Sequence, residues 1–212
     1  MTVLKEYQFM IPSAKKMARA IYCMTLVAGT ALLAGCMSSS AQEGYYPTYR
    51  EASLSHATVS PEERLDQLDP AKRTGIENFM TLFADITQPG LADRIADVYA
   101  DEIYFNDTLH TFTLRSELSN YLASTAEKLD FYQVNYDDLV VSGENVYIRW
   151  TMENQFTVLG NDVESTTIGI TQVRVDENGK VVFHQDFWDS TEGIFRHIPM
   201  VGYFIGKARE QI

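Results

Sequence analysis

An imidazole and a carboxylate alternate along an apolar segment near the end of the sequence. His184 and Asp186 are separated by one residue, and Trp188 follows at the same spacing. On a β-strand these three side chains share one face, because successive side chains point to opposite faces. An acid and a histidine in an apolar pocket suit proton transfer, since burial raises the pKa of a carboxyl group and histidine exchanges protons near neutral pH. The alternative is a neutralised pair with a structural role only.

The strands that must position this pair are predicted to form a meander. Turn clusters at 142–145, 160–162 and 176–179 separate four stretches rich in β-branched and aromatic residues, near 131–141, 146–158, 163–175 and 180–189. Loops this short between long strands predict antiparallel pairing. A loop at 176–179 pairs Thr171 with His184, and a loop at 160–161 places Thr171 beside Trp150. One face then carries Ile148, Trp150, Met152, Thr171, Val173, His184, Asp186 and Trp188.

The opposite face of the last strand is equally apolar. It carries Val181, Phe183 and Phe187 together with Gln185 and Asp189. Periodicity alone therefore does not identify the face that encloses a cavity. The two tryptophans of the first face fit a packed core as well as the wall of a ligand site.

Helical spacing precedes the meander. Asp69 followed by Pro70 is typical of a helix start, and apolar residues recur at helical spacing from there to about Thr87. After a break at 88–90 we expect a shorter helix over 91–99, a strand over 103–107, and a third helix that Thr113 caps and that ends near residue 129. Helices followed by a meander predict the α+β class, with three helices packed on one face of a curled antiparallel sheet.

This order, together with the run from Tyr99 to Asp107, resembles the nuclear transport factor 2-like superfamily. The later run from Asp176 to Asp189 is similar to the last hairpin of its SnoaL-like branch, typified by polyketide cyclases. The resemblance covers roughly residues 70–195 and implies a cone-shaped, cystatin-like roll. Because this fold hosts isomerases, cyclases, dehydratases, epoxide hydrolases and binding modules without catalysis, it does not fix an activity.

The resemblance also implies which residues form the site. Positions that match His184, Asp186 and Trp188 face the cavity in the superfamily's steroid isomerases, and Asp107 matches their general base. The implied catalytic residues are Asp107, His184 and Asp186, and the implied ligand-binding residues are Phe105, Trp150, Thr171 and Trp188. Asp107 has a second interpretation, because an Asp at a strand end commonly hydrogen-bonds the following turn.

Two classes of function remain open on the sequence alone. The isomerases' oxyanion donors match positions close to Phe83 or Met80, and Thr171, none of which supplies an equivalent donor. That absence favours a cavity that binds a small hydrophobic ligand without turnover. The grouping of two acids and an imidazole favours an isomerase, cyclase or dehydratase that does acid and base chemistry on a hydrophobic or lipid-derived substrate.

The first 35 residues have the features of a targeting segment. Lys15, Lys16 and Arg19 precede a short apolar run that ends in the sequence Leu33-Ala34-Gly35-Cys36. This resembles the lipobox of bacterial lipoproteins, and the resemblance implies cleavage before Cys36 and its acylation with palmitate-type chains. Met37 after the cysteine implies sorting to the outer membrane, facing the periplasm. An uncut signal anchor is the alternative.

The chain is therefore expected to comprise four segments. They are a signal peptide at 1–35, the lipidated Cys36 with a flexible tether at 36–69, a SnoaL-like domain at 70–192 and an amphipathic tail at 193–212. The tail combines large apolar residues with Arg196, Lys207 and Arg209. It is predicted to pack on the domain, to extend into a homodimer or to enter the bilayer beside the anchor.

Composition narrows the range of partners. The net charge of −12 argues against nucleic acid as a partner. Of the two cysteines, Cys23 lies in the segment to be removed and Cys36 carries lipid, so we expect no disulfide and a stability that rests on an apolar core. The four histidines lack the spacing of metal ligands, and we expect neither a metal nor another cofactor.

Overall fold

The computed structural model describes residues 46–54 and 61–212, which belong to one compact unit, Gly44–Ile212. The predicted signal peptide and Cys36 lie outside the described residues. Within the described residues, no helix combines the length and the apolar character needed to cross a bilayer. Two short helices, α2 (Tyr46–Leu54) and α3 (Pro61–Leu65), lie in the segment expected to be a tether.

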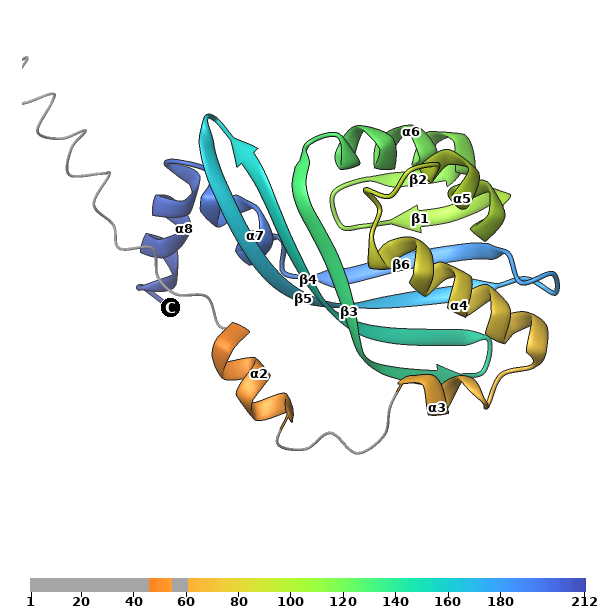
Figure 1. The fold of residues 1–212 in the computed structure, drawn as a ribbon. Helices are drawn as coiled ribbons and strands as arrows, with labels where there is room; N and C mark the ends of the chain where they lie inside the picture. Colours follow the sequence, from red (N-terminus) through yellow and green to blue (C-terminus); the bar gives the residue numbers. More distant parts are fainter. Residues whose placement is uncertain (1–45, 55–60) are drawn as a thin grey trace, which may run out of the picture. The chain divides into compact units, whose positions relative to one another are not determined.

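The centre of the unit is a six-stranded sheet in the order β2-β1-β6-β5-β4-β3. All neighbours are antiparallel except β1 and β6, which are parallel. In Figure 1 the long strands bend across the molecule, and α4, α5 and α6 lie on the side toward which they curl. The strands are β1 (Tyr99–Asn106), β2 (Thr111–Leu114), β3 (Leu129–Ser142), β4 (Asn145–Val158), β5 (Asn161–Val175) and β6 (Val181–Trp188).

The helices on the sheet begin largely where the sequence predicts. Helix α4 (Pro70–Ala84) starts at Pro70, and the Asp69 carboxylate accepts a hydrogen bond from the Lys72 backbone N–H at 3.0 Å. Helix α5 (Leu91–Val98) follows Gly90, whose φ of 74° is accessible to glycine at little cost. Helix α6 (Arg115–Ala126) starts directly after β2 and has no side-chain cap, so the expectation that Thr113 caps it is wrong.

The core lies between these helices and the sheet. Buried residues of α4, α5 and α6 pack against buried residues of the strands behind them. Helix α4 approaches the β5–β6 turn so closely that a Cβ atom at Gly75 would lie 2.2 Å from the Gly179 carbonyl oxygen. The central members of this core are Ile76, Phe79, Leu82, Ile95, Leu118, Leu139, Ile148, Val173 and Val181.

The predicted strand register is shifted by two residues in both hairpins. Thr171 pairs with Asp186 and with Ile148, rather than with His184 and Trp150. In the first hairpin the two-residue loop is Leu159 and Gly160, one position earlier than expected. In the second, the loop is one residue longer and an irregularity near Val175 adds another. Because each shift is even, every side chain keeps the face that the sequence predicts.

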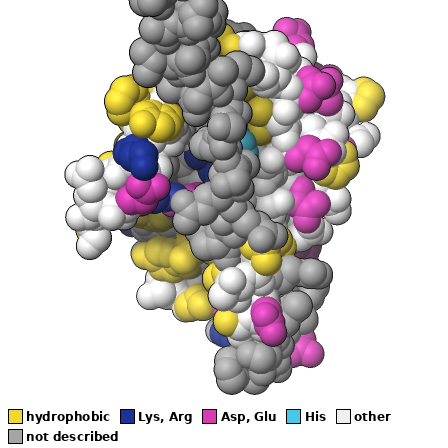
Figure 2. Space-filling view, turned by 90° about the vertical axis from the view of Figure 1, so that its left-hand side faces the viewer, with side chains coloured by type: hydrophobic (Ala, Val, Ile, Leu, Met, Phe, Trp, Pro, Cys, Tyr) yellow, Lys and Arg dark blue, Asp and Glu magenta, His cyan; other side chains and the backbone are white. Residues whose placement is uncertain are grey.

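The C-terminal segment consists of α7 (Ser190–Gly193), the 3-10 helix η1 (Phe195–His197) and α8 (Val201–Arg209). Its first part packs on the sheet, where the Ser165 hydroxyl donates to the Gly193 carbonyl at 2.8 Å. Burial alone would raise the pKa of the Glu192 carboxyl group, but hydrogen bonds from Arg209 and Arg196 hold that pKa below its ordinary value. Figure 2 views the end of the molecule at which α8 lies in Figure 1, and exposed hydrophobic side chains there adjoin basic ones.

Candidate functional site

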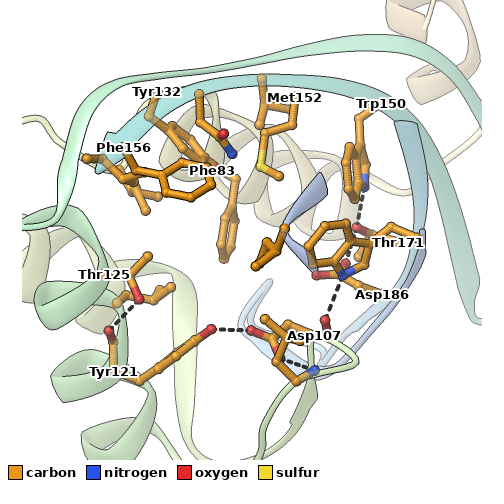
Figure 3. Close-up of a pocket in the computed structure, with 18 of the residues that line it drawn as sticks. Phe83, Asp107, Tyr121, Thr125, Tyr132, Trp150, Met152, Phe156, Thr171 and Asp186 are labelled. Atoms are coloured by element: carbon orange, nitrogen blue, oxygen red, sulfur yellow. Dashed lines mark hydrogen bonds between the residues drawn. The ribbon is translucent and has the colours of Figure 1, made fainter. Parts of the chain in front are cut away.

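The curled sheet and the helices on it enclose a cavity of about 400 Å³. Figure 3 shows side chains from β3, β4, β6 and α6 converging on it. A few polar groups interrupt a wall that is largely apolar, which is the usual composition of a small-molecule site. Aromatic rings dominate the wall, contributed by Phe79, Phe83, Phe105, Tyr121, Tyr132, Tyr136, Trp150, Phe156 and Trp188.

One group of polar side chains, here called the His184 group, spans the sheet. It consists of Tyr99, Trp150, Thr171, His184 and Asp186. The Trp150 indole N–H donates to the Thr171 hydroxyl at 2.9 Å, and this hydroxyl donates to Asp186 Oδ1 at 2.5 Å. His184 Nε2 lies 2.9 Å from the same oxygen, and His184 Nδ1 lies 2.6 Å from the Tyr99 hydroxyl. Strand pairing between β4, β5, β6 and β1 brings these five residues together.

Hydrogen-bond roles in the His184 group follow from Tyr99. Burial, reinforced by the Asp186 charge, raises the pKa of Tyr99 well above its ordinary value, so its hydroxyl keeps its proton. That hydroxyl donates to His184 Nδ1, which places the proton of a neutral imidazole on Nε2, facing Asp186. Every donor in the chain then points toward one carboxylate. The imidazole is 1% exposed and Phe79, Phe83 and Phe105 surround it edge-on.

A second polar group, here called the Asp107 group, consists of Asp107, Tyr121 and Trp188. Asp107 follows β1, and its Oδ1 accepts hydrogen bonds from the backbone N–H groups of Leu109 at 2.9 Å and His110 at 2.7 Å. Its Oδ2 accepts the Tyr121 hydroxyl at 2.5 Å, and the Trp188 indole donates to its carbonyl oxygen at 2.7 Å. Both interpretations of Asp107 therefore describe this structure, because one carboxylate oxygen bonds the turn and the residue also lines the cavity.

Glycines make room for the two tryptophans. A Cβ atom at Gly169 would lie 2.3 Å from Trp150 Cζ2, and one at Gly193 would lie 2.5 Å from Trp188 Cζ3. Both distances are far below van der Waals contact. Gly169 pairs with Trp150 on β4 and with Trp188 on β6, so the absence of its side chain gives the Trp150 ring its place on the cavity face.

All of the sequence-predicted site residues within the described chain line this one cavity. They are Phe105, Asp107, Trp150, Thr171, His184, Asp186 and Trp188. Their roles in catalysis or ligand binding stay predictions. Cys36 lies outside the described residues. Among residues 46–54 and 61–212, no group of three or more His, Cys, Asp or Glu side chains is arranged to hold a metal ion.

The sequence analysis missed the tyrosines of the site. Tyr99 and Tyr121 bond the acid–imidazole groups, and Tyr132 and Tyr136 lie in the wall. Burial is the main cause that raises the pKa of all four above the ordinary value, so each is a hydrogen-bond donor near neutral pH. Tyr99 was assigned to a helix, and its role depends on β1 pairing with β6, which no local pattern predicts.

Comparison with known proteins now identifies the family. Residues 69–184, more than half of the chain, match the family model of the SnoaL-like domain. The protein therefore belongs to the SnoaL-like family, as the sequence resemblance predicts. No curated protein matches the chain significantly.

Solved structures agree on the fold. A candidate SnoaL-like polyketide cyclase from Shewanella denitrificans OS-217 is 12% identical, with a TM-score of 0.51 over 58% of this chain and 94% of that chain. One from Jannaschia sp. CCS1 is 16% identical, with a TM-score of 0.49 over 59% of this chain and 94% of that chain. At such low identity the likeness concerns the fold alone.

Proposed function

We propose that this protein binds a small hydrophobic ligand in the cavity of its SnoaL-like domain and is held at the bacterial envelope by acylated Cys36. The observation that carries the first part is the cavity of about 400 Å³, walled by aromatic rings. Each methylene group of a ligand that leaves water for such a wall contributes about 0.8 kcal/mol to binding. The few polar groups of the wall would orient the ligand.

Binding without turnover is favoured by the surroundings of Asp107. A general base must reach a proton of its substrate. Both carboxylate oxygens of Asp107 already accept hydrogen bonds, two at Oδ1 and one at Oδ2. A substrate would have to displace the Tyr121 hydroxyl to engage Oδ2, whereas a ligand that only binds needs no such rearrangement.

The two tryptophans of the chain offer a direct test, because both Trp150 and Trp188 line the cavity. Titration of the purified domain with octanol should change the tryptophan fluorescence saturably. Thr125→Phe should weaken octanol binding about tenfold, because Thr125 lies in the wall and a phenyl ring there fills the space.

Thr81→Phe is a matched control. Thr81 on α4 is exposed and donates to the Glu77 carbonyl, as Thr125 on α6 donates to the Tyr121 carbonyl, but it does not line the cavity. Octanol should therefore bind this variant as it binds the wild type. Equal loss of binding in both variants, or no saturable signal in the wild type, would exclude the cavity as the binding site.

The anchor part of the proposal rests on the Leu33–Cys36 sequence. Two or more acyl chains hold a protein at a membrane far more firmly than one. Replacement Cys36→Ser should move the protein from the membrane fraction to the soluble fraction of a bacterial cell. Cys23→Ser, the only other cysteine position, should leave it membrane-bound. Membrane association that survives the first substitution would refute acylation, and the proposed outer-membrane location would then lose its basis.

A second candidate is an acid–base enzyme of the isomerase, cyclase or dehydratase type. It is supported by the presence of two carboxylates and an imidazole in one apolar cavity. In this case the protein should exchange α-protons of an apolar ketone with deuterated water, and Asp107→Asn should abolish the exchange while the variant still folds. Mass spectrometry of the recovered ketone measures the exchange, and its absence in the wild type would argue against this candidate.

A further inference from the structure

The cavity contains two carboxylates and no basic partner for either. Asp107 is bonded by two backbone N–H groups and the Tyr121 hydroxyl, all of them uncharged. Asp186 accepts from the Thr171 hydroxyl and faces the Nε2 of His184, whose other nitrogen accepts from Tyr99 and which is therefore neutral. Figure 3 shows Asp107 and Asp186 on the same side of the cavity.

The wall offers almost no positive charge in return. Of the described residues that line the cavity, Lys128 is the only lysine or arginine. Its side chain is exposed, and no ion pair joins it to Asp107 or Asp186 within the described part of the chain. The site is thus an apolar chamber with a negative field, and two nearby carboxylates in an apolar surrounding strengthen that field for each other's counter-ion.

The wall also lacks donors for its acceptors. Asn154 lines the cavity, and its buried Oδ1 has no hydrogen-bond partner in the described residues. Asp186 directs Oδ1 to both of its partners, so its hydrogen bonds leave Oδ2 available. A buried acceptor without a donor costs free energy that a ligand with N–H groups can recover.

Aromatic faces complete this arrangement. Rings of Phe, Tyr and Trp surround the chamber, and their negative faces attract a cation, most strongly where water is excluded. From the unpartnered carboxylates, the unpartnered acceptor and the aromatic wall, we propose that the ligand is a lipophilic amine, bound as its ammonium ion with the nitrogen toward Asp107 and Asp186 and the hydrocarbon part among the rings. This inference rests on the proposed ligand-binding function and names the chemical class of the ligand.

Three probes with one hydrocarbon chain test the inference. Octylamine, octanol and octanoate carry a positive, a neutral and a negative head group, and each is titrated into the purified domain with tryptophan fluorescence as the signal. We expect octylamine to bind about tenfold tighter than octanol, and octanoate to bind more weakly than either. Equal binding of octylamine and octanol, or tightest binding of octanoate, would overturn the inference and leave hydrophobic ligand binding intact. Failure of all three probes would overturn both.

Charge-neutral variants locate the effect. Asp107→Asn and Asp186→Asn should each reduce octylamine binding several-fold while octanol binding stays within about twofold of the wild type. Asp97→Asn removes one charge from an exposed position on α5 that does not line the cavity, and it should change neither affinity. If Asp97→Asn lowers octylamine affinity as much as the cavity variants do, the preference reflects the overall negative charge of the protein and the inference is wrong.

Discussion

The two polar groups of the cavity are built in different ways. The Asp107 group depends on a local turn, in which one carboxylate oxygen bonds backbone N–H groups two and three residues further along the chain. The His184 group depends on four strands, and the residues that His184 bonds to Tyr99 are 85 positions apart. His184 and Tyr99 are buried, whereas Asp107 and Tyr121 are partly exposed. The difference indicates that the His184 group contributes to the stability of the fold, and that the Asp107 group can rearrange around a ligand.

The largest expected effect is on the His184 group. His184→Leu leaves the buried Tyr99 hydroxyl without its acceptor and Asp186 without one of its two partners, so the free energy of unfolding should fall by about 3 kcal/mol. Urea denaturation followed by circular dichroism measures this loss. Val173→Leu or a similar apolar exchange on β5 would not serve as a control, because Val173 is itself buried in the core.

Gln185→Leu is a better control for His184→Leu. It changes the neighbouring residue of β6, a half-buried side chain that hydrogen-bonds Tyr104 and Asn106 and does not line the cavity. It should cost much less than His184→Leu. A loss below about 1 kcal/mol for His184→Leu would contradict a stabilising role for this group.

The second effect concerns alkaline pH. Burial raises the pKa of Tyr99 above the ordinary value of 10.0. Above that ordinary value, unfolded chains release the phenolic proton while the folded protein retains it, so the free energy of unfolding falls by about 1.4 kcal/mol per pH unit for each such tyrosine. Tyr99→Phe should remove one such contribution from the pH dependence of urea denaturation. An unchanged alkaline slope in this variant would mean that the Tyr99 hydroxyl is accessible to solvent.

The smallest effect is expected in the Asp107 group. Tyr121→Phe removes one hydrogen bond from a partly exposed carboxylate that keeps two backbone donors, so the free energy of unfolding should fall by about 1 kcal/mol or less. The same denaturation experiment measures it. A loss as large as that of His184→Leu would erase the difference between the two groups.

Much of the fold is predictable from the sequence because its signals are local. The Asp69–Pro70 start of α4 and the four long strands follow from capping residues, periodicity and turn clusters. Strand β2 was missed, since its four residues form a short edge strand next to the start of α6. Helix α4 ends at Ala84 rather than near Thr87, because the Asp85 carboxylate accepts from the Thr87 N–H and forms a turn.

The site was predictable by face but not by partner. The period of two residues along a strand places Thr171, His184 and Asp186 on one face even when the register is off by two. Which side chain touches which depends on loop lengths, an irregularity in β5–β6 and the parallel pairing of β1 with β6. For that reason the Tyr99–His184 contact and the Tyr121–Asp107 contact emerge only from the structure.

The central claim is that an apolar molecule enters the cavity. The most direct measurement is a crystal structure of the domain soaked with a brominated octanol, in which anomalous scattering locates the bromine atom. The account predicts a bromine peak inside the cavity, among the rings of Phe83, Trp150 and Phe156. A well-ordered crystal with bromine only on the outer surface, and an unoccupied cavity, would contradict it.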